Sequence, residues 1–250
     1  MKRPRVTDSR RTDPRRRALL QATAALTALS VLPRAGRAAE APSRPMKIGI
    51  IGSGNVGSAL GRVWARAGHQ VMFSSRHLED DRKLAAEIGA NARAGTPREA
   101  AEFGEVLLFA VPYGALPELG KTLADLLDGK VVIDACNPFP HRDGEIANVA
   151  RERGAGIVSA ELLPGARIVR AFNAVGAARM GRAHEEPGRF GMPIAGDDEQ
   201  AIEIASRLIR DIGYEPVLIG GLEKGRHLMP GTALAGERSP EEVRKIAATL

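Results

Sequence analysis

The sequence predicts an α/β fold with one mainly parallel sheet, and three observations lead to that prediction. Short apolar runs alternate with helix-like segments from residue 46 to about residue 230. The run Val106–Val111 is apolar at every position, as expected of a parallel strand that is buried on both faces. The apolar run at 47–51 leads directly into a glycine-rich turn and a helical pattern. We therefore expect a doubly wound sheet in a single folded domain.

The glycine-rich turn carries the pattern G-x-G-x-x-G. In this pattern Gly52 makes a tight turn, Gly54 lets the backbone approach a pyrophosphate, and Gly57 lets the following helix pack close to the strand. The helix N-terminus then presents free N–H groups and the positive end of its dipole to the anion. The context predicts a Rossmann-type dinucleotide site formed by Gly52, Ser53, Gly54, Asn55, Val56 and Gly57.

The end of the second predicted strand indicates which dinucleotide binds. A site for NAD places Asp or Glu about 20 residues beyond the glycines, where it takes the ribose hydroxyls. Here Ser74, Ser75 and Arg76 follow the strand at 70–73. Two hydroxyls and a guanidinium can hydrogen-bond a 2′-phosphate, so we predict NADP(H). The alternative interpretation makes Arg76 a solvated loop residue.

The remaining elements follow from apolar spacing and capping residues. Thr96 to Glu99 form a capped helix start, and Asp197 and Asp198 cap another helix. Pro193 predicts an edge position for its strand. The predicted helices cover 78–90, a segment from 97, 116–127, 199–212 and a short segment after Ser239, and the predicted strands cover 130–134, 168–173, 190–196 and 215–219.

The positive charge of the chain is concentrated at its N-terminus. The formal net charge is +6, with 36 Lys and Arg against 30 Asp and Glu. Eleven of these basic residues and three of the acidic ones lie in residues 1–45, so the rest carries a net charge of about −2. A slightly acidic globular part offers no basic face for a phosphate backbone, which argues against nucleic-acid binding.

Residues 1–45 have the order of an export signal. A basic region ends in Arg15–Arg17, a mildly apolar stretch covers 18–32, and small residues follow Pro33. Arg16-Arg17-Ala18-Leu19-Leu20 resembles the twin-arginine motif, which predicts periplasmic localisation. The stretch is too short and too polar to be a comfortable membrane span, and we expect no stable membrane insertion of the protein after signal removal. The alternative is a cytoplasmic protein that starts at Met46.

Three segments are therefore expected: a signal and short linker at 1–45, an NADP-binding domain at 46–230, and a polar C-terminal tail with a short helix at 231–250. Cys136 is the sole cysteine, so no intrachain disulfide is possible. It ends an apolar strand, and we predict a buried, inert thiol there. No metal site is predicted, and a homodimer is compatible with the sequence.

The ordered motifs resemble a known family. They are Gly52–Gly57, Ser74–Arg76, Ala110–Pro112, Asp134–Pro138, Ala171–Asn173 and Ala195–Asp198. Together they resemble the coenzyme F420-dependent NADP oxidoreductases and their flavin-using relatives, such as the oxidoreductase domains of metalloreductases. The likeness covers nearly all of residues 46–230. It implies a Rossmann domain and direct hydride transfer between NADP(H) and coenzyme F420 or a flavin (FMN or FAD).

The resemblance also implies roles for individual residues. Val111, Pro112, Tyr113, Asn137 and Pro138 would line the nicotinamide, and Phe172 and Asn173 would wall the pocket of the second ring. No catalytic acid or base is implied, because hydride exchange between stacked rings depends on proximity and orientation. Each residue also has a simpler interpretation: both asparagines can satisfy turn backbone, and Phe172 can belong to the core.

Two other functions remain open from the sequence. One is a non-catalytic NADP(H)-binding sensor or partner subunit. The other is a small-molecule dehydrogenase whose substrate site forms at a dimer interface, which requires a proton donor. His141, His184 and His227 are the candidate donors, and His227, in a loop after the last predicted strand, is the favoured one.

Overall fold

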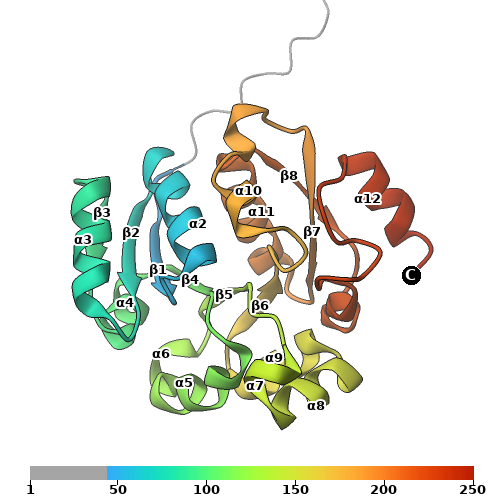
Figure 1. The fold of residues 1–250 in the computed structure, drawn as a ribbon, viewed down its shortest axis with the longest axis horizontal. Helices are drawn as coiled ribbons and strands as arrows, with labels where there is room; N and C mark the ends of the chain where they lie inside the picture. Colours follow the sequence, from blue (N-terminus) through green and yellow to red (C-terminus); the bar gives the residue numbers. More distant parts are fainter. Residues whose placement is uncertain (1–43) are drawn as a thin grey trace, which may run out of the picture. The chain divides into compact units, whose positions relative to one another are not determined.

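The computed structural model describes residues 44–250, and these residues contain an eight-stranded sheet in the order β3-β2-β1-β4-β5-β6-β7-β8 (Figure 1). Neighbouring strands from β3 to β6 are parallel, β7 is antiparallel to β6, and β8 is parallel to β7. The strands are β1 (Lys47–Ile51), β2 (Gln70–Ser74), β3 (Ala92–Ala94), β4 (Val106–Phe109), β5 (Val131–Asp134), β6 (Arg167–Arg170), β7 (Phe190–Gly196) and β8 (Tyr214–Leu218). The predicted α/β fold with a mainly parallel sheet is confirmed.

Helices connect the strands. The α-helices are α2 (Asn55–Arg66), α3 (Leu78–Ile88), α4 (Pro97–Phe103), α5 (Leu116–Thr122), α6 (Ala124–Leu127), α7 (Pro140–Asp143), α8 (Glu145–Arg153), α9 (Ala155–Leu162), α10 (Ala177–Met180), α11 (Glu199–Asp211) and α12 (Pro240–Ala247), and the 3₁₀ helices are η1 (Tyr113–Ala115), η2 (Ala183–Glu185) and η3 (Leu222–His227). Figure 1 shows α2 and α3 beside β1 and β2, and α12 beside β7 and β8.

Capping residues place several helix starts as predicted. Thr96 and Glu99 form a reciprocal capping box at α4, and the side chain of Asp198 accepts a hydrogen bond from the Ala201 N–H at α11. The predicted helix at 116–127 is two helices, because the chain leaves helical geometry at Leu123. The sequence interpretation missed β3, the four-residue helix α10, and the three helices α7, α8 and α9. The last three follow one another with glycine breaks, at Gly144 and Gly154, that interrupt any long apolar period.

The sheet is buried on both faces, as the apolar strands predict. Along β4, the side chains of Val106 and Leu108 join one core, while those of Leu107 and Phe109 join the other. The first core is built on α2 and α11, and the indole N–H of Trp64 in α2 donates to the Leu208 carbonyl in α11 at 2.9 Å. Helix α4 and the helices between β4 and β6 cover the second. This double cover leaves the carboxyl ends of the strands as the accessible edge.

The edge position predicted for the strand with Pro193 is wrong, because β8 lies outside β7. The physical reason is the length of the ladder between β6 and β7. Only Val169 and Arg170 of β6 pair with β7, and they pair with Gly196 and Ala195. Pro193 faces Val217 of β8 and has no partner in β6, so its missing N–H costs no hydrogen bond on that side.

The segment after residue 230 packs on the far end of the sheet. Leu234 and Val243 are buried in a third cluster with Ala195, Val217 and Leu228. Helix α12 begins at the capping box predicted around Ser239. None of the helices within residues 44–250 has the length and apolarity that crossing a bilayer requires. Nearly all of the predicted export leader lies outside the described residues.

Candidate functional site

The turn between β1 and α2 has a geometry that only glycine permits. Gly52 has a φ of 102°, and a Cβ there would lie 2.5 Å from the carbonyl oxygen of Ala110, in the loop that follows β4. A Cβ on Gly57 would lie 1.9 Å from the Gly52 carbonyl oxygen. The Gly52 N–H donates to the Ser74 carbonyl at 2.8 Å, which ties the turn to the end of β2. These two glycines shape the turn itself.

Gly54 differs from these two glycines. A Cβ built on it would meet no atom within 4 Å. Its φ of −63° and ψ of −160° suit other residues too, so nothing in the protein's own packing requires glycine here. It is the N-cap of α2, and no side chain caps the helix. The first N–H groups of a helix have no intrahelical acceptor. A bare backbone beside free N–H groups fits a pyrophosphate, since it allows close approach.

A cavity of about 270 Å³ opens beside this turn. It lies at the carboxyl ends of β1, β4 and β5, where the strand order reverses and open α/β sheets bind ligands. Its walls come from α2 and from the loops after β4 and β5. The lining residues are Asn55, Val56, Ala110, Val111, Pro112, Ala135, Asn137, Phe139 and Arg142. Five of the residues predicted for the coenzyme, Asn55, Val56, Val111, Pro112 and Asn137, are brought together here.

A buried ion pair supports the loop that follows β5. Asp134 and Arg170 face each other across β5 and β6, are fully buried, and are joined by a hydrogen bond of 2.6 Å. Arg170 also donates to the Cys136 carbonyl at 3.1 Å, and the Cys136 N–H donates to the Asp134 carboxylate at 2.8 Å. The loop therefore leaves the strand in a defined direction, toward the cavity wall at Asn137.

Asn137 and Asn173 form the next part of this support. The side-chain amide of Asn137 donates to the Asn173 carbonyl at 2.8 Å, and that of Asn173 donates to the Cys136 carbonyl at 3.3 Å. The Oδ1 atom of each side chain is buried and has no hydrogen-bond partner among the described residues. Asn137 lines the cavity, so its amide oxygen suits an N–H donor of a bound ring. Asn173 and Pro138 are buried and do not belong to the wall.

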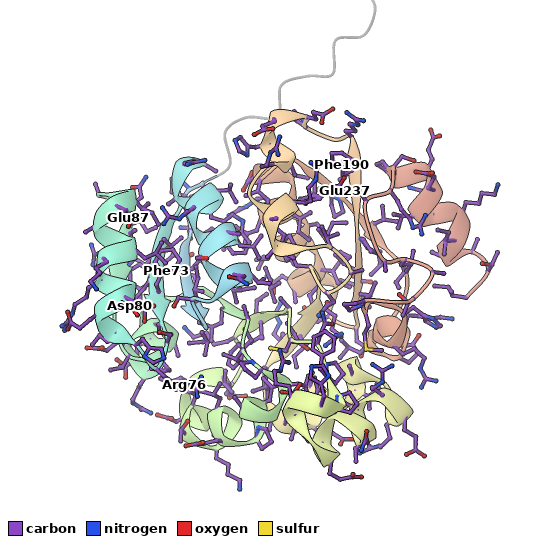
Figure 2. The ribbon with its side chains drawn as sticks, in the orientation of Figure 1. Phe73, Arg76, Asp80, Glu87, Phe190 and Glu237 are labelled. Atoms are coloured by element: carbon purple, nitrogen blue, oxygen red, sulfur yellow. The ribbon has the colours of Figure 1, made fainter. Side chains whose placement is uncertain are left out.

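The end of β2 differs from the sequence interpretation. Ser74 is fully buried, and its hydroxyl donates to the Ile50 carbonyl at 2.7 Å, so the predicted contact with a 2′-phosphate is wrong for this residue. Ser75 is only partly buried, and Arg76 is exposed. Figure 2 shows Arg76 beyond the end of the strand that carries Phe73. The structure also brings a carboxylate here: Ser53 and Ser75 both donate hydrogen bonds to Asp81 in α3. Nothing in the local sequence pattern distinguished Asp81 from its acidic neighbours.

Two aromatic residues predicted to face the bound rings belong to the core instead. Tyr113 is fully buried, and its hydroxyl donates to the Ala155 carbonyl at 2.9 Å, because α9 covers this face of the sheet. Burial raises the pKa of this phenol. Phe172 has a φ of 67° and packs edge-on against Trp64 and Tyr214 at centroid distances of 6.1 and 6.3 Å. The core interpretation of Phe172 is therefore the correct one.

The remaining candidate groups lie outside the cavity wall. His227 ends η3 and is not a lining residue, and its pKa is lowered by partial burial and then by the charges of Lys224 and Arg226. Cys136 is buried as predicted, and burial raises the pKa of its thiol well above the ordinary value. Within residues 44–250 no cluster of three or more His, Cys, Asp or Glu could hold a metal ion.

Comparison with known proteins identifies the family. The family model described as NADP oxidoreductase, coenzyme F420-dependent, matches residues 47–138, which include the glycine turn and the loops after β4 and β5. The F420-dependent NADP reductase of Methanothermobacter marburgensis is 30% identical over 198 residues, covering 72% of this chain and 87% of the relative. Metalloreductase STEAP3 of Rattus norvegicus is 29% identical over 196 residues, which cover 77% of this chain but only 38% of that protein.

A solved structure supports the fold. The crystal structure of a putative F420-dependent NADP-reductase from Arthrobacter sp. FB24 has a TM-score of 0.64 and 21% identity, over 72% of this chain and 87% of that chain. The likeness extends beyond the residues that the family model matches. With the glycine turn, the cavity at the strand-order reversal and these relatives, the chain belongs to the coenzyme F420-dependent NADP oxidoreductase family and is an NADP-dependent oxidoreductase.

Proposed function

We propose that this protein transfers hydride between NADP(H) and the ring of a deazaflavin, coenzyme F420, or of a flavin. The observation that carries the proposal is the composition of the cavity wall. No lining residue is a His, Asp, Glu, Lys, Cys or Tyr, and Arg142 is its one charged member. A carbonyl or imine substrate needs a proton donor as it accepts hydride, whereas a deazaflavin or flavin ring accepts hydride without one from the wall.

The residues present fit NADP(H). The open backbone at Gly54 and the N-terminus of α2 suit the pyrophosphate. When bound, the nicotinamide supplies the hydride. Val111 and Pro112 give the wall an apolar surface, and the Oδ1 of Asn137 can accept a hydrogen bond from a ring amide. The chain's own contribution is orientation and exclusion of water, which set the distance and angle for hydride transfer.

Hydrogen bonds fix the side chain of Arg142 at the edge of the cavity. Its guanidinium donates to the Asn137 carbonyl and to the carboxylate of Asp143, each at 2.8 Å. Asp143 in turn accepts the Phe139 N–H at 2.9 Å. The segment from Asn137 to Asp143, which ends in α7, is thus closed by polar contacts between its own residues, and it holds Phe139 and Asn137 in fixed places in the cavity wall. A preorganised wall is what ring stacking requires, because orientation is the main source of acceleration here.

The choice of NADP(H) over NAD(H) rests in this proposal on Arg76. It is exposed at the end of β2 and free of the hydrogen bonds that hold Ser74 in the core. We expect Arg76→Ala to raise the Kd of NADPH roughly 10- to 100-fold, the value of a charge-assisted hydrogen bond to the 2′-phosphate, and to leave the Kd of NADH nearly unchanged. Fluorescence titration of both coenzymes measures this.

The matched control for this prediction is Arg82→Ala. Arg82 lies on α3 and pairs with Glu79 on the exposed helix surface, so its loss removes the same charge from a neighbouring place. We expect less than a twofold change in either Kd from this variant. Equal weakening of NADPH and NADH by Arg76→Ala would contradict the assignment of the 2′-phosphate to this residue.

The hydride acceptor is tested with the purified full-length chain. NADPH oxidation is followed with F420, FMN and FAD offered separately, and with NADH as the control donor. We expect turnover with at least one of the three ring acceptors and a marked preference for NADPH as donor. Turnover with F420 alone supports the deazaflavin assignment, and turnover with FMN or FAD alone supports a flavin. NADPH binding without oxidation by any of them contradicts the proposed hydride transfer and favours a non-catalytic NADP(H)-binding protein.

A further inference from the structure

Asp81 is a buried carboxylate at the junction of two coenzyme loops. It lies in the first turns of α3, and only 1% of its surface is exposed. Its carboxylate accepts hydrogen bonds from Ser53 in the glycine turn and from Ser75 after β2, the latter at 2.8 Å. No Arg, Lys or His pairs with it in an ion pair within the described residues. The hydroxyls and the positive end of α3 are what stabilise its charge.

These contacts decide what the two serines can offer to a ligand. A serine hydroxyl has one hydrogen and two acceptor lone pairs. An ionised carboxylate only accepts, so both hydroxyl hydrogens are directed at Asp81. Ser75 Oγ also accepts the His77 N–H at 3.0 Å, which orders the turn that carries Arg76. In this arrangement the serines can accept hydrogen bonds from a ligand but have none left to donate.

A 2′-phosphate and a ribose 2′-hydroxyl respond to this arrangement in opposite ways. The phosphate is a near-dianion at neutral pH and has only acceptor oxygens, so it gains nothing from hydroxyls whose hydrogens are committed elsewhere. It is also repelled by a carboxylate held one hydroxyl away. The hydroxyl of NAD(H) can instead donate to Ser53 or Ser75. Asp81 therefore favours NAD(H), against the effect of Arg76.

We propose that Asp81 is a positioning residue that helps to determine coenzyme specificity. By accepting the hydroxyl hydrogens of Ser53 and Ser75, it lowers the preference of this protein for NADP(H) over NAD(H). The inference rests on the proposed 2′-phosphate site beside Arg76. It does not depend on which ring accepts the hydride.

The test is Asp81→Asn in the full-length chain. Asparagine has the same shape and keeps one acceptor oxygen, so it can hold one serine as before. Its amide donates to the other serine, whose hydrogen then becomes available to a phosphate. Isothermal titration with NADP⁺ and NAD⁺, and no hydride acceptor, measures both Kd values. We expect the ratio of the Kd of NAD⁺ to that of NADP⁺ to rise about tenfold, the size of one recovered charge-assisted hydrogen bond.

Asp80→Asn is the matched control. It removes the same charge from the neighbouring position, where Asp80 is exposed on α3 (Figure 2) and pairs with Lys83 at the helix surface. We expect less than a twofold change in the ratio. A purely structural role of Asp81 would weaken both coenzymes alike and leave the ratio unchanged. That result, or a fall in the ratio, would overturn the proposal.

A double-mutant cycle with Ser75→Ala adds a readout that does not require Asp81→Asn to be as stable as the parent. In the parent chain the Ser75 hydrogen is already committed, so Ser75→Ala should act on the Kd of NADP⁺ only through the lost support of the turn that carries Arg76. In the Asp81→Asn background the same substitution should raise the Kd of NADP⁺ by a larger factor than it does in the parent. If Ser75→Ala raises the Kd of NADP⁺ in the parent by a factor equal to or larger than in the Asp81→Asn background, the hydroxyl already donates to the phosphate in the parent and the proposal is wrong. Failure of Arg76→Ala to affect NADP⁺ would instead refute the location of the phosphate site.

Discussion

Replacing Gly54 with Ala is expected to weaken NADP⁺ binding about a hundredfold and to leave the fold nearly as stable as before. A Cβ at this position meets no protein atom within 4 Å, and the backbone angles are open to alanine. The change in free energy of unfolding should stay within about 1 kcal/mol. The methyl group would instead occupy the space through which a pyrophosphate reaches the N–H groups of α2. Loss of two such hydrogen bonds accounts for the expected factor.

Gly57→Ala is the matched comparison, three residues along the same turn. Its Cβ would lie 1.9 Å from the Gly52 carbonyl oxygen, so α2 must move away from β1. We expect a loss of about 3 kcal/mol in the free energy of unfolding, together with weaker binding. Urea unfolding and isothermal titration on both variants separate the two roles. NADP⁺ binding by Gly54→Ala with parental affinity would mean that the pyrophosphate does not cross this turn.

The second large effect is expected at the buried ion pair of β5 and β6. Arg170→Met leaves the carboxylate of Asp134 fully buried without its cation. Removal of one partner of such a pair costs about 3–5 kcal/mol, because the other charge stays desolvated. The same substitution at Arg153, whose pair with Glu161 is half exposed, should cost under about 1 kcal/mol. Urea unfolding measures both.

A second substitution shows whether the unpaired charge is the cause. Adding Asp134→Asn to Arg170→Met removes the buried charge while an amide oxygen can still accept the Cys136 N–H. We expect the double variant to recover part of the lost stability, as found generally when both members of a buried pair become neutral. A loss below 1 kcal/mol for Arg170→Met alone would show that water reaches the pair. The loop at Asn137 should also lose its anchor, so NADPH binding should weaken in the single variant.

The two sets of effects act on the two halves of the proposed site. The glycines act on the pyrophosphate end, while Asp134 and Arg170 act on the loop that supports Asn137 and the cavity wall. No hydrogen bond or ion pair among the described residues joins the two groups, so we expect their effects on the free energy of binding to add in a combined variant, to within about 0.5 kcal/mol. This independence follows from the double-wound sheet, in which separate strands deliver the parts of a ligand site to one edge.

The sequence predicted correctly the roles of residues that depend on their near neighbours in the chain. Gly52 and Gly57 are required by one tight turn and one close approach, both set within six residues of chain. Thr96, Asp198 and Ser239 cap helices through contacts with residues three positions on. The apolar strands required burial on both faces, and the structure provides it. Short-range geometry and hydrophobic periodicity are visible in a sequence because neighbours in the chain are neighbours in space.

Other residues have roles that depend on distant parts of the chain. Ser74 and Ser75 are adjacent and identical, yet Ser74 donates to β1 and Ser75 to Asp81, because Ser74 is the last residue of β2 while Ser75 lies in the turn that follows, next to α3. Tyr113 belongs to the core because α9, more than forty residues later, supplies its acceptor. Phe172 belongs to the core because α2 brings Trp64 against it.

The sequence by itself determined the fold class, the coenzyme turn and the family. The tertiary structure alone decided which side chains line the cavity, which carboxylate holds Ser53 and Ser75, and how Arg170 finds Asp134 across neighbouring strands. The physical reason is that turn geometry and apolar period are properties of a few consecutive residues. The destination of a polar or aromatic side chain depends instead on which distant helix or strand covers it, because a buried polar group must find its partner wherever the fold places one.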